Sequence, residues 1–224
     1  MIISSYIEHT VLRQGLSFED ISEGLDLCSD LSLPVLVIPP SFVRQAADLN
    51  PLNENISICT VIGFPLGYST FETKIFEIEN ALENGADELD LVIDNSLIRH
   101  KRWSDFETEI SAYRKSCSGK ILKIIVETSL LNRNELERIA GILVENQADY
   151  IKTSTGFVGE GAQIEDIIFL KENFGDRIKI KASGGIKTRV QALEFIKAGA
   201  DRIGTSSSKQ ITENVQTKKM LMLK

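Results

Sequence analysis

Short runs rich in Val, Ile and Leu alternate along this chain with longer segments in which apolar residues recur at helical spacing. The short runs have the length of β-strands, and the longer segments have the amphipathic pattern of surface helices. Strands are predicted at Tyr6–His9, Pro34–Ile38, Ile56–Ile62, Glu88–Ile93, Ile121–Glu127, Tyr150–Thr153, Ile178–Ala182 and Arg202–Gly204. Helices are predicted at Phe18–Ser29, Ser41–Asp48, Thr70–Asn84, Trp103–Cys117, Arg133–Asn146, Ile164–Asn173 and Thr188–Ala198, with a last helix after Ser207.

Eight strands, each followed by a helix, within 224 residues is the count of a (β/α)8 barrel. The competing architecture is an open doubly wound sheet, whose nucleotide-binding members carry a Gly-rich turn after the first strand. No such turn stands near residue 10. Gly85 and Gly199 follow predicted helices, where glycine can adopt a left-handed cap. We therefore predict an α/β protein with a (β/α)8 TIM barrel, formed by one domain over residues 1–224.

The composition is that of a globular protein, with 42% hydrophobic and 25% charged residues. The net charge of −7 argues against a general nucleic-acid or acidic-membrane binder. The three cysteines, Cys28, Cys59 and Cys117, are far apart and odd in number, which favours reduced thiols over disulfides or a zinc site. No apolar run has membrane-spanning length, and residues 1–5 lack the pattern of a signal peptide. We expect a cytoplasmic protein.

Lysines recur on three consecutive predicted strands. In (β/α)8 enzymes the catalytic residues lie where the strands end and the following loops begin. Because side chains alternate along a strand, the groups that share a face are Lys123 with Ile125 and Glu127, Tyr150 with Lys152, and Lys179 with Lys181. Several cations in one volume disfavour protonation, so one amine should titrate far below the usual value of about 10.4. A neutral amine is the nucleophile that Schiff-base chemistry requires, and Lys152, which precedes a Thr/Ser/Gly turn, is the candidate.

Two acids lie on one face of the strand that follows Gly85-Ala86. Glu88 and Asp90 need partners if that face is buried, because an unpaired buried charge is costly. Lys152 and Lys181 are natural partners, and Asp90 could orient a water or a substrate hydroxyl. The alternative is an ion network without a chemical role, in which the lysines pair with these acids or with Glu127.

Glycine-rich segments follow the seventh and eighth predicted strands, which is the usual phosphate position in these barrels. Glycine lets the backbone approach a ligand, and N–H groups at a following helix start favour an anion. The residues in question are Gly184, Gly185, Gly204 and Ser206. We predict that they bind a phosphate monoester.

On the basis of these residues, the chain resembles the deoxyribose-phosphate aldolases, which are class I aldolases with a (β/α)8 fold. The resemblance extends from about Ile7 to Ser207. The matching segments are Glu8–Thr10, Val61–Gly67, Gly85–Val92, Lys123–Thr128, Ala148–Phe157, Lys181–Ile186 and Gly204–Ser207. The resemblance implies that Lys152 forms the Schiff base, Lys181 lowers its pKa and relays protons, Asp90 acts with a bound water, and Lys123 tunes the site. It also implies that the four glycine-loop residues hold the phosphate.

The chain departs from the family pattern at several places. Glu8 stands where the family usually has an aspartate, and the second strand reads Val35-Leu36-Val37-Ile38-Pro39 in place of Val-Cys-Val-Asn-Pro. Asp94-Asn95-Ser96 replaces the more usual Asn-Ile-Gly, and the segment 218–224 lacks the terminal tyrosine of some members. None of these changes touches the lysine pair, so they bear on turnover and aldehyde preference more than on reaction type.

The expected function is reversible aldol cleavage of 2-deoxy-D-ribose 5-phosphate to acetaldehyde and D-glyceraldehyde 3-phosphate through a lysine Schiff base. The alternatives are another Schiff-base sugar-phosphate aldolase and a non-catalytic phosphate-binding relative. We expect no cofactor and no metal, because the imine serves as electron sink and the two histidines, His9 and His100, have no ligand-spaced partner. A small sugar phosphate is the expected partner and a homodimer the expected assembly, without nucleic acid or membrane.

Overall fold

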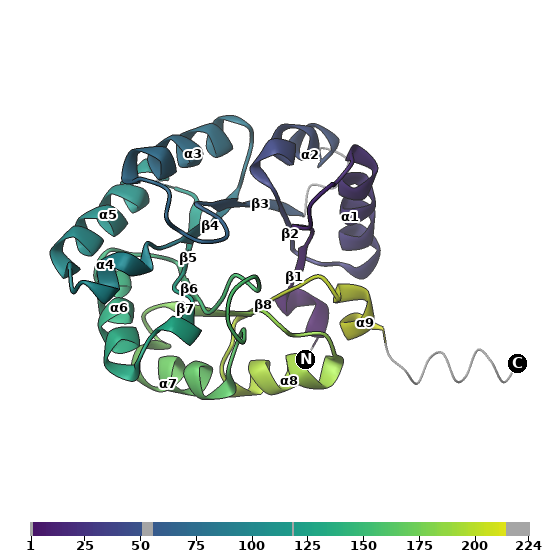
Figure 1. The fold of residues 1–224 in the computed structure, drawn as a ribbon. Helices are drawn as coiled ribbons and strands as arrows, with labels where there is room; N and C mark the ends of the chain where they lie inside the picture. Colours follow the sequence, from purple (N-terminus) through teal and green to yellow (C-terminus); the bar gives the residue numbers. More distant parts are fainter. Residues whose placement is uncertain (1, 51–55, 118, 214–224) are drawn as a thin grey trace, which may run out of the picture.

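The computed structural model, described over residues 2–50, 56–117 and 119–213, contains a closed barrel of parallel strands in the order β1 to β8. Figure 1 shows the strands at the centre of a ring of helices. The strands are β1 Ile7–Thr10, β2 Val35–Ile38, β3 Ser57–Ile62, β4 Glu88–Val92, β5 Ile121–Ile125, β6 Tyr150–Lys152, β7 Lys179–Ser183 and β8 Arg202–Thr205. The predicted (β/α)8 fold is confirmed, and the open doubly wound sheet is excluded by the pairing of β1 with β8.

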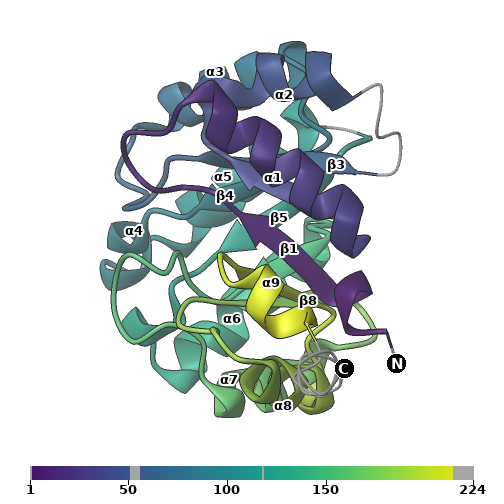
Figure 2. The same ribbon diagram turned by 90° about the vertical axis from the view of Figure 1, so that its right-hand side faces the viewer.

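The helices cover the outside of the barrel. They are α1 Phe18–Leu31, α2 Val43–Leu49, α3 Phe71–Glu83, α4 Asn95–Arg99, α5 Trp103–Ser116, α6 Arg133–Glu145, α7 Ile164–Phe174, α8 Arg189–Ala198 and α9 Ser208–Thr212. Short 3-10 turns occur at η1 Ile3–Tyr6, η2 Pro40–Phe42 and η4 Thr128–Leu130. The sequence pattern missed α4, which is short and begins with an Asp94 cap. The last helix, α9, contacts β1 (Figure 2), and the segment 218–224 lies outside the described residues.

Local sequence signals set several helix boundaries. Ser17, Asn132 and Thr188 each accept the N–H of the third helical residue, in the reciprocal arrangement of a capping box. Gly85 and Gly199 follow helices with φ values of 100° and 117°, the left-handed conformation predicted for them. These signals are local, so they can be read from the sequence without knowledge of the fold.

The amino ends of the strands are tied together by three aspartates. Each of them precedes an even-numbered strand and accepts a backbone N–H from the neighbouring odd-numbered strand. The bonds run from Ile58 to Asp87 at 3.0 Å, from Leu122 to Asp149 at 2.8 Å and from Ile180 to Asp201 at 2.8 Å. They lie at the base of the barrel, at the end opposite to the carboxyl ends of the strands, and they help to fix the register between neighbours.

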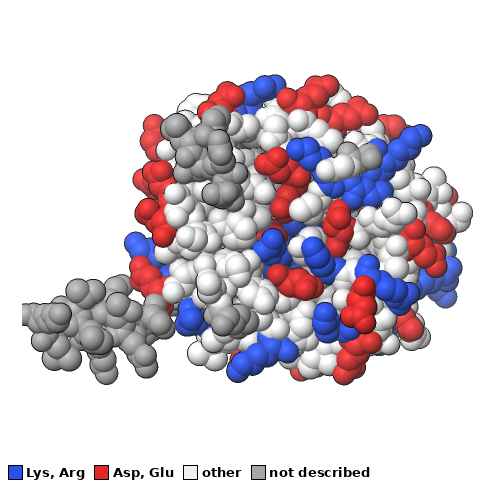
Figure 3. All heavy atoms as spheres, turned by 180° about the vertical axis from the view of Figure 1, so that it is seen from behind, with Lys and Arg blue, Asp and Glu red and all other residues white. Residues whose placement is uncertain are grey.

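The two faces of the strands differ in chemistry. Leu89, Leu91 and Ile151 are fully buried in the apolar layer between strands and helices. Their neighbours Asp90 and Lys152 are also buried, but they point into the barrel and carry charge. On the face opposite to that of Figure 1, basic and acidic side chains are interspersed (Figure 3). None of the described helices has the length and apolar character needed to cross a membrane.

Candidate active site

A buried ionic cluster occupies the barrel interior, with Asp90 of β4 at its centre. One oxygen of Asp90, Oδ2, accepts from Lys152 Nζ at 2.7 Å and from Lys181 Nζ at 2.6 Å. The other oxygen, Oδ1, accepts from Lys123 Nζ at 3.1 Å. The three lysines come from the adjacent strands β5, β6 and β7. The structure therefore brings together all four residues that the sequence singled out for chemistry.

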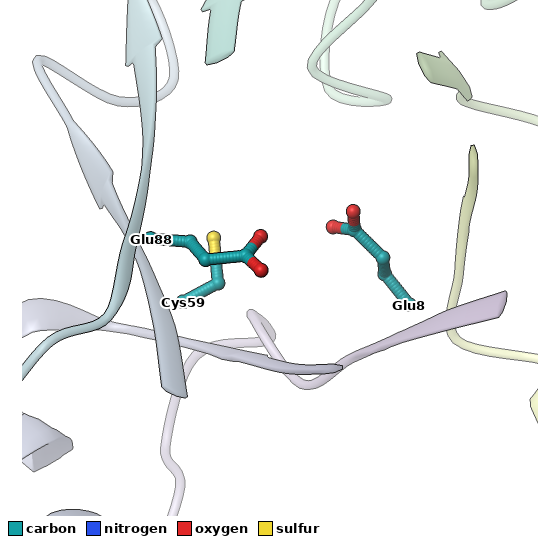
Figure 4. Close-up of side chains that lie close together, drawn as sticks. All are labelled: Glu8, Cys59 and Glu88. Atoms are coloured by element: carbon teal, nitrogen blue, oxygen red, sulfur yellow. The ribbon is translucent and has the colours of Figure 1, made fainter. Parts of the chain in front are cut away.

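Two glutamates and a thiol surround Lys123 on its other side. Its ammonium lies 2.5 Å from Glu88 Oε2, 3.3 Å from Cys59 Sγ and 3.5 Å from Glu8 Oε2. Glu8, Cys59 and Glu88 are the one set of potential metal ligands found in the described part of the chain, and they face one another across the barrel (Figure 4). The Lys123 ammonium already serves as their cation, so this set does not fit a metal ion. Glu8 also forms an ion pair with Lys181.

The three buried amines differ in their pKa values. Burial lowers the pKa of Lys152, and the charge of Lys181 acts in the same direction, while Asp90 opposes both. Burial also disfavours the charged form of Lys181, but Asp90 and Glu8 outweigh it and raise the pKa of that amine. The pKa of Lys123 is raised well above its usual range, because its acidic neighbours outweigh burial. Lys152 is therefore the amine of this cluster with the lowered pKa.

A cavity of about 700 Å³ opens at the carboxyl ends of the strands. Lys152 lines it, whereas Asp90, Lys123 and Lys181 do not. A ligand in this cavity thus has access to one amine of the cluster, and the other charged groups lie behind it.

The same cavity is lined by all four residues of the two predicted phosphate loops. They are Gly184, Gly185, Gly204 and Ser206. Gly184 and Gly185 have φ values of 88° and 78°, which side-chain-bearing residues rarely adopt. Within the described residues, the backbone N–H groups of Gly184, Gly185 and Ser206 donate to no acceptor in the protein. They can therefore donate to an anion.

Sequence reasoning missed several residues of the cavity wall. Thr10 is the last residue of β1, Arg13 lies in the loop that follows it, Thr155 in the loop after Lys152, and Lys187 in the loop before α8. Arg13 forms an ion pair with Asp20, which partly neutralises the charge of the guanidinium group. No periodicity in the sequence shows that the side chains of Arg13 and Lys187 face one cavity.

Comparison with known proteins places this chain in a family. Residues 35–213 match the family model described as DeoC/LacD family aldolase. The chain is 44% identical over 211 residues to a deoxyribose-phosphate aldolase of Clostridioides difficile, covering 94% of this chain and 95% of the relative. It is 48% identical over 210 residues to one of Ureaplasma parvum, with 93% and 97% covered.

This chain belongs to the DeoC/LacD aldolase family. Its fold agrees with solved structures of aldolases. One named QR15, an aldolase, superposes with a TM-score of 0.90 at 35% identity, covering 100% of this chain and 99% of the other. The deoxyribose phosphate aldolase of Aeropyrum pernix, described as a unique tetramer, superposes with a TM-score of 0.88 at 31% identity, with 98% and 92% covered. The protein is accordingly an aldolase, a carbon–carbon lyase.

Two expectations about the interior of this DeoC/LacD aldolase were wrong. Lys179 does not join the cluster: it is exposed at the start of β7, with its ammonium 5.4 Å from the Tyr150 ring centre. Glu127 does not share the face of Lys123, because β5 ends at Ile125 and Glu127 adopts a left-handed conformation with φ of 56°. Alternation of side chains holds only while the strand continues.

The two histidines differ in environment. His9 is buried, lies beside the cavity and shares a 3.0 Å hydrogen bond between Nδ1 and Ser208 Oγ. Burial lowers the pKa of His9 to about 4, so the ring is neutral at neutral pH. His100 is exposed at the end of α4, with Nδ1 2.9 Å from the carbonyl oxygen of Ser96.

Proposed function

We propose that this aldolase catalyses the reversible cleavage of 2-deoxy-D-ribose 5-phosphate to acetaldehyde and D-glyceraldehyde 3-phosphate. The observation that carries the proposal is the position of Lys152, whose amine has a lowered pKa and lines a cavity that also contains two glycine loops with free N–H groups. The relatives named deoxyribose-phosphate aldolase, at 44% and 48% identity, support the substrate.

The proposed reaction begins at the Lys152 amine. Its nitrogen attacks the C1 aldehyde of the open-chain sugar, and loss of water gives a protonated imine. The imine accepts the electron pair of the C2–C3 bond as that bond breaks, while a base removes the proton of the C3 hydroxyl and D-glyceraldehyde 3-phosphate leaves. The remaining enamine takes a proton at C2, and water then hydrolyses the imine to release acetaldehyde and free Lys152.

Asp90 and Lys181 would transfer protons to and from the Lys152 amine. Lys181 and Lys152 share one oxygen of Asp90, at 2.6 and 2.7 Å, so a proton can pass between the amines through that carboxylate or a water beside it. The Lys181 charge also helps to lower the pKa of Lys152. Lys123 holds the second oxygen of Asp90 at 3.1 Å, which fixes the orientation of the carboxylate.

The phosphate would sit at the other end of the cavity. Gly184, Gly185, Gly204 and Ser206 would surround it, mainly through backbone N–H groups. The lysine end performs the carbon–carbon chemistry, and the glycine end anchors the substrate.

Trapping the imine tests this proposal. Borohydride reduction in the presence of acetaldehyde should attach an ethyl group to Lys152, and peptide mass spectrometry locates it. Lys152→Met should abolish both the label and the cleavage of deoxyribose 5-phosphate. A label on Lys181 would overturn the assignment of the nucleophile. A wild-type protein that is trapped only by other aldehydes or ketones would be an aldolase for another donor, and phosphate binding without any imine would indicate a non-catalytic relative.

A further inference from the structure

Glu127, at the end of β5, is a buried carboxylate outside the lysine cluster. The residue is only 3% exposed, and its backbone has φ and ψ of 56° and 69°. A side-chain-bearing residue rarely adopts this left-handed conformation, and where it does, the surrounding contacts hold it there. The proposed reaction gives this carboxylate no part.

Those contacts lead to the wall of the cavity. Glu127 Oε2 accepts two hydrogen bonds from Thr155, one from the backbone N–H at 3.0 Å and one from the hydroxyl at 2.7 Å. The Thr155 hydroxyl oxygen in turn accepts from the N–H of Phe157 at 3.2 Å. Thr155 and Phe157 both line the cavity, three and five residues after Lys152. One carboxylate oxygen therefore fixes the loop that follows the proposed nucleophile.

The same loop is hydrogen-bonded to the end of β7. Thr153 Oγ1 donates to the carbonyl oxygen of Ser183 at 3.2 Å and accepts its N–H at 3.1 Å. Ser183 Oγ donates to the carbonyl oxygen of Ser154 at 2.5 Å. A displacement of the 153–155 segment would thus be transmitted to the residue that immediately precedes Gly184.

Further along, the loop touches the first phosphate segment directly. The N–H of Ala162 donates to the carbonyl oxygen of Gly184 at 3.3 Å. A Cβ built on Gly184 would lie 2.9 Å from the Cα of Gly161 and 3.4 Å from the Cα of Gly156. Backbone packs on backbone here, so the position of Gly184 depends on where the 153–162 loop is held.

We propose that Glu127 is a positioning residue for anion binding: by clamping Thr155 it holds the 153–162 loop against Gly184 and so sets the affinity of the glycine end of the cavity for phosphate. The proposal rests on the proposed function in taking that end as the phosphate site. Within the described part of the chain, Glu127 forms no hydrogen bond or ion pair with Lys123, Lys152 or Lys181, and it does not line the cavity. Its removal should therefore weaken phosphate binding and leave imine formation intact.

The test compares Glu127→Gln and Glu127→Ala with the wild-type protein, using inorganic phosphate in a calorimetric titration. Loss of a hydrogen bond to a charged acceptor corresponds to roughly a tenfold effect or more. We expect the dissociation constant for phosphate to rise about tenfold in Glu127→Ala and by less in Glu127→Gln, which keeps an acceptor oxygen. Trapping of acetaldehyde on Lys152 by borohydride, which involves no phosphate, should proceed at the wild-type rate in both.

Asp201→Asn is the matched control. Asp201 also accepts a backbone N–H, that of Ile180 at 2.8 Å, but at the base of the barrel. Its substitution should lower the thermal midpoint without changing phosphate affinity. Wild-type phosphate affinity in folded Glu127→Gln and Glu127→Ala would overturn the positioning role, as would parallel losses in all three variants. If the wild type binds phosphate but forms no imine, the proposed reaction fails while Glu127 is still judged on phosphate affinity alone.

Discussion

Gly204 lies directly against the side chain of Lys181. A Cβ built on Gly204 would be 3.1 Å from Lys181 Cε and 3.0 Å from Ser183 Cβ. The sequence placed Gly204 with the phosphate loops, and it does line the cavity. Its missing side chain also leaves room for the lysine that pairs with Asp90 and Glu8. The glycine end and the lysine end of the site thus meet at this residue.

Replacing Gly204 by alanine should therefore impair the chemistry itself. The added methyl would push the Lys181 chain away from Asp90, and a small misplacement of a reacting group can cost up to about 100-fold in rate. We expect kcat to fall about tenfold for both deoxyribose 5-phosphate and free deoxyribose. Steady-state kinetics with the two sugars is the measurement. A rise in KM confined to the phosphorylated sugar would show that Gly204 serves only the phosphate.

Gly185 should behave differently. A Cβ there meets only the carbonyl oxygen of Glu160, at 3.9 Å, but the φ of 78° disfavours any side-chain-bearing residue. Gly185→Val should shift the backbone N–H groups away from the phosphate and raise KM for deoxyribose 5-phosphate about tenfold or more. Free deoxyribose serves as the control substrate. Equal losses on both sugars would contradict a role in phosphate binding.

The dependence of activity on pH should report the pKa of Lys152. The Lys181 charge lowers that pKa, so Lys181→Leu should raise it and reduce the neutral fraction of the amine at pH 7. The rise of kcat/KM with pH should therefore move to higher pH in Lys181→Leu. At high pH only part of the wild-type kcat/KM should return in Lys181→Leu, because the proton relay through Lys181 is lost as well.

Lys179→Leu is the control for that variant. Lys179 is exposed at the opposite end of β7 and meets only the Tyr150 ring among the contacts described. Because Lys179 is exposed, we expect Lys179→Leu to have small effects on both stability and kcat/KM. Near-normal turnover in Lys181→Leu together with collapse in Lys179→Leu would show that the wrong lysine was assigned.

His9 should make stability depend on pH. Its pKa is about 4 in the folded protein and about 6.5 when exposed, so unfolding takes up a proton between these values. The stabilising contribution is complete above pH 6.5 and is lost as the pH falls toward 4. Relative to wild type, His9→Gln should lose about 3 kcal/mol less of its free energy of unfolding over that interval. Urea unfolding from pH 7.5 to 4 measures this, with His100→Gln as the control, and parallel curves would contradict it.

The sequence by itself determined the barrel. Strand and helix periodicity gave all eight strands and the helices between them, apart from the short α4. It also put Asp90, Lys123, Lys152 and Lys181 on inward faces, where the structure brings them into contact. These features are local, because the alternation of side chains and the capping of helices depend on residues a few positions apart.

The tertiary structure decided which of these residues meet the cavity and what each charge is paired with. The alternation of side chains put Lys179 and Lys181 on the same face of β7. Their positions along the strand decide the rest: Lys179 is exposed at its amino end, and Lys181 is buried in the ionic cluster. The turn of the backbone at Glu127 takes its carboxylate to Thr155 instead of to Lys123. Depth in the barrel and the burial that lowers the pKa of Lys152 arise from strands far apart in the chain, so no local pattern encodes them.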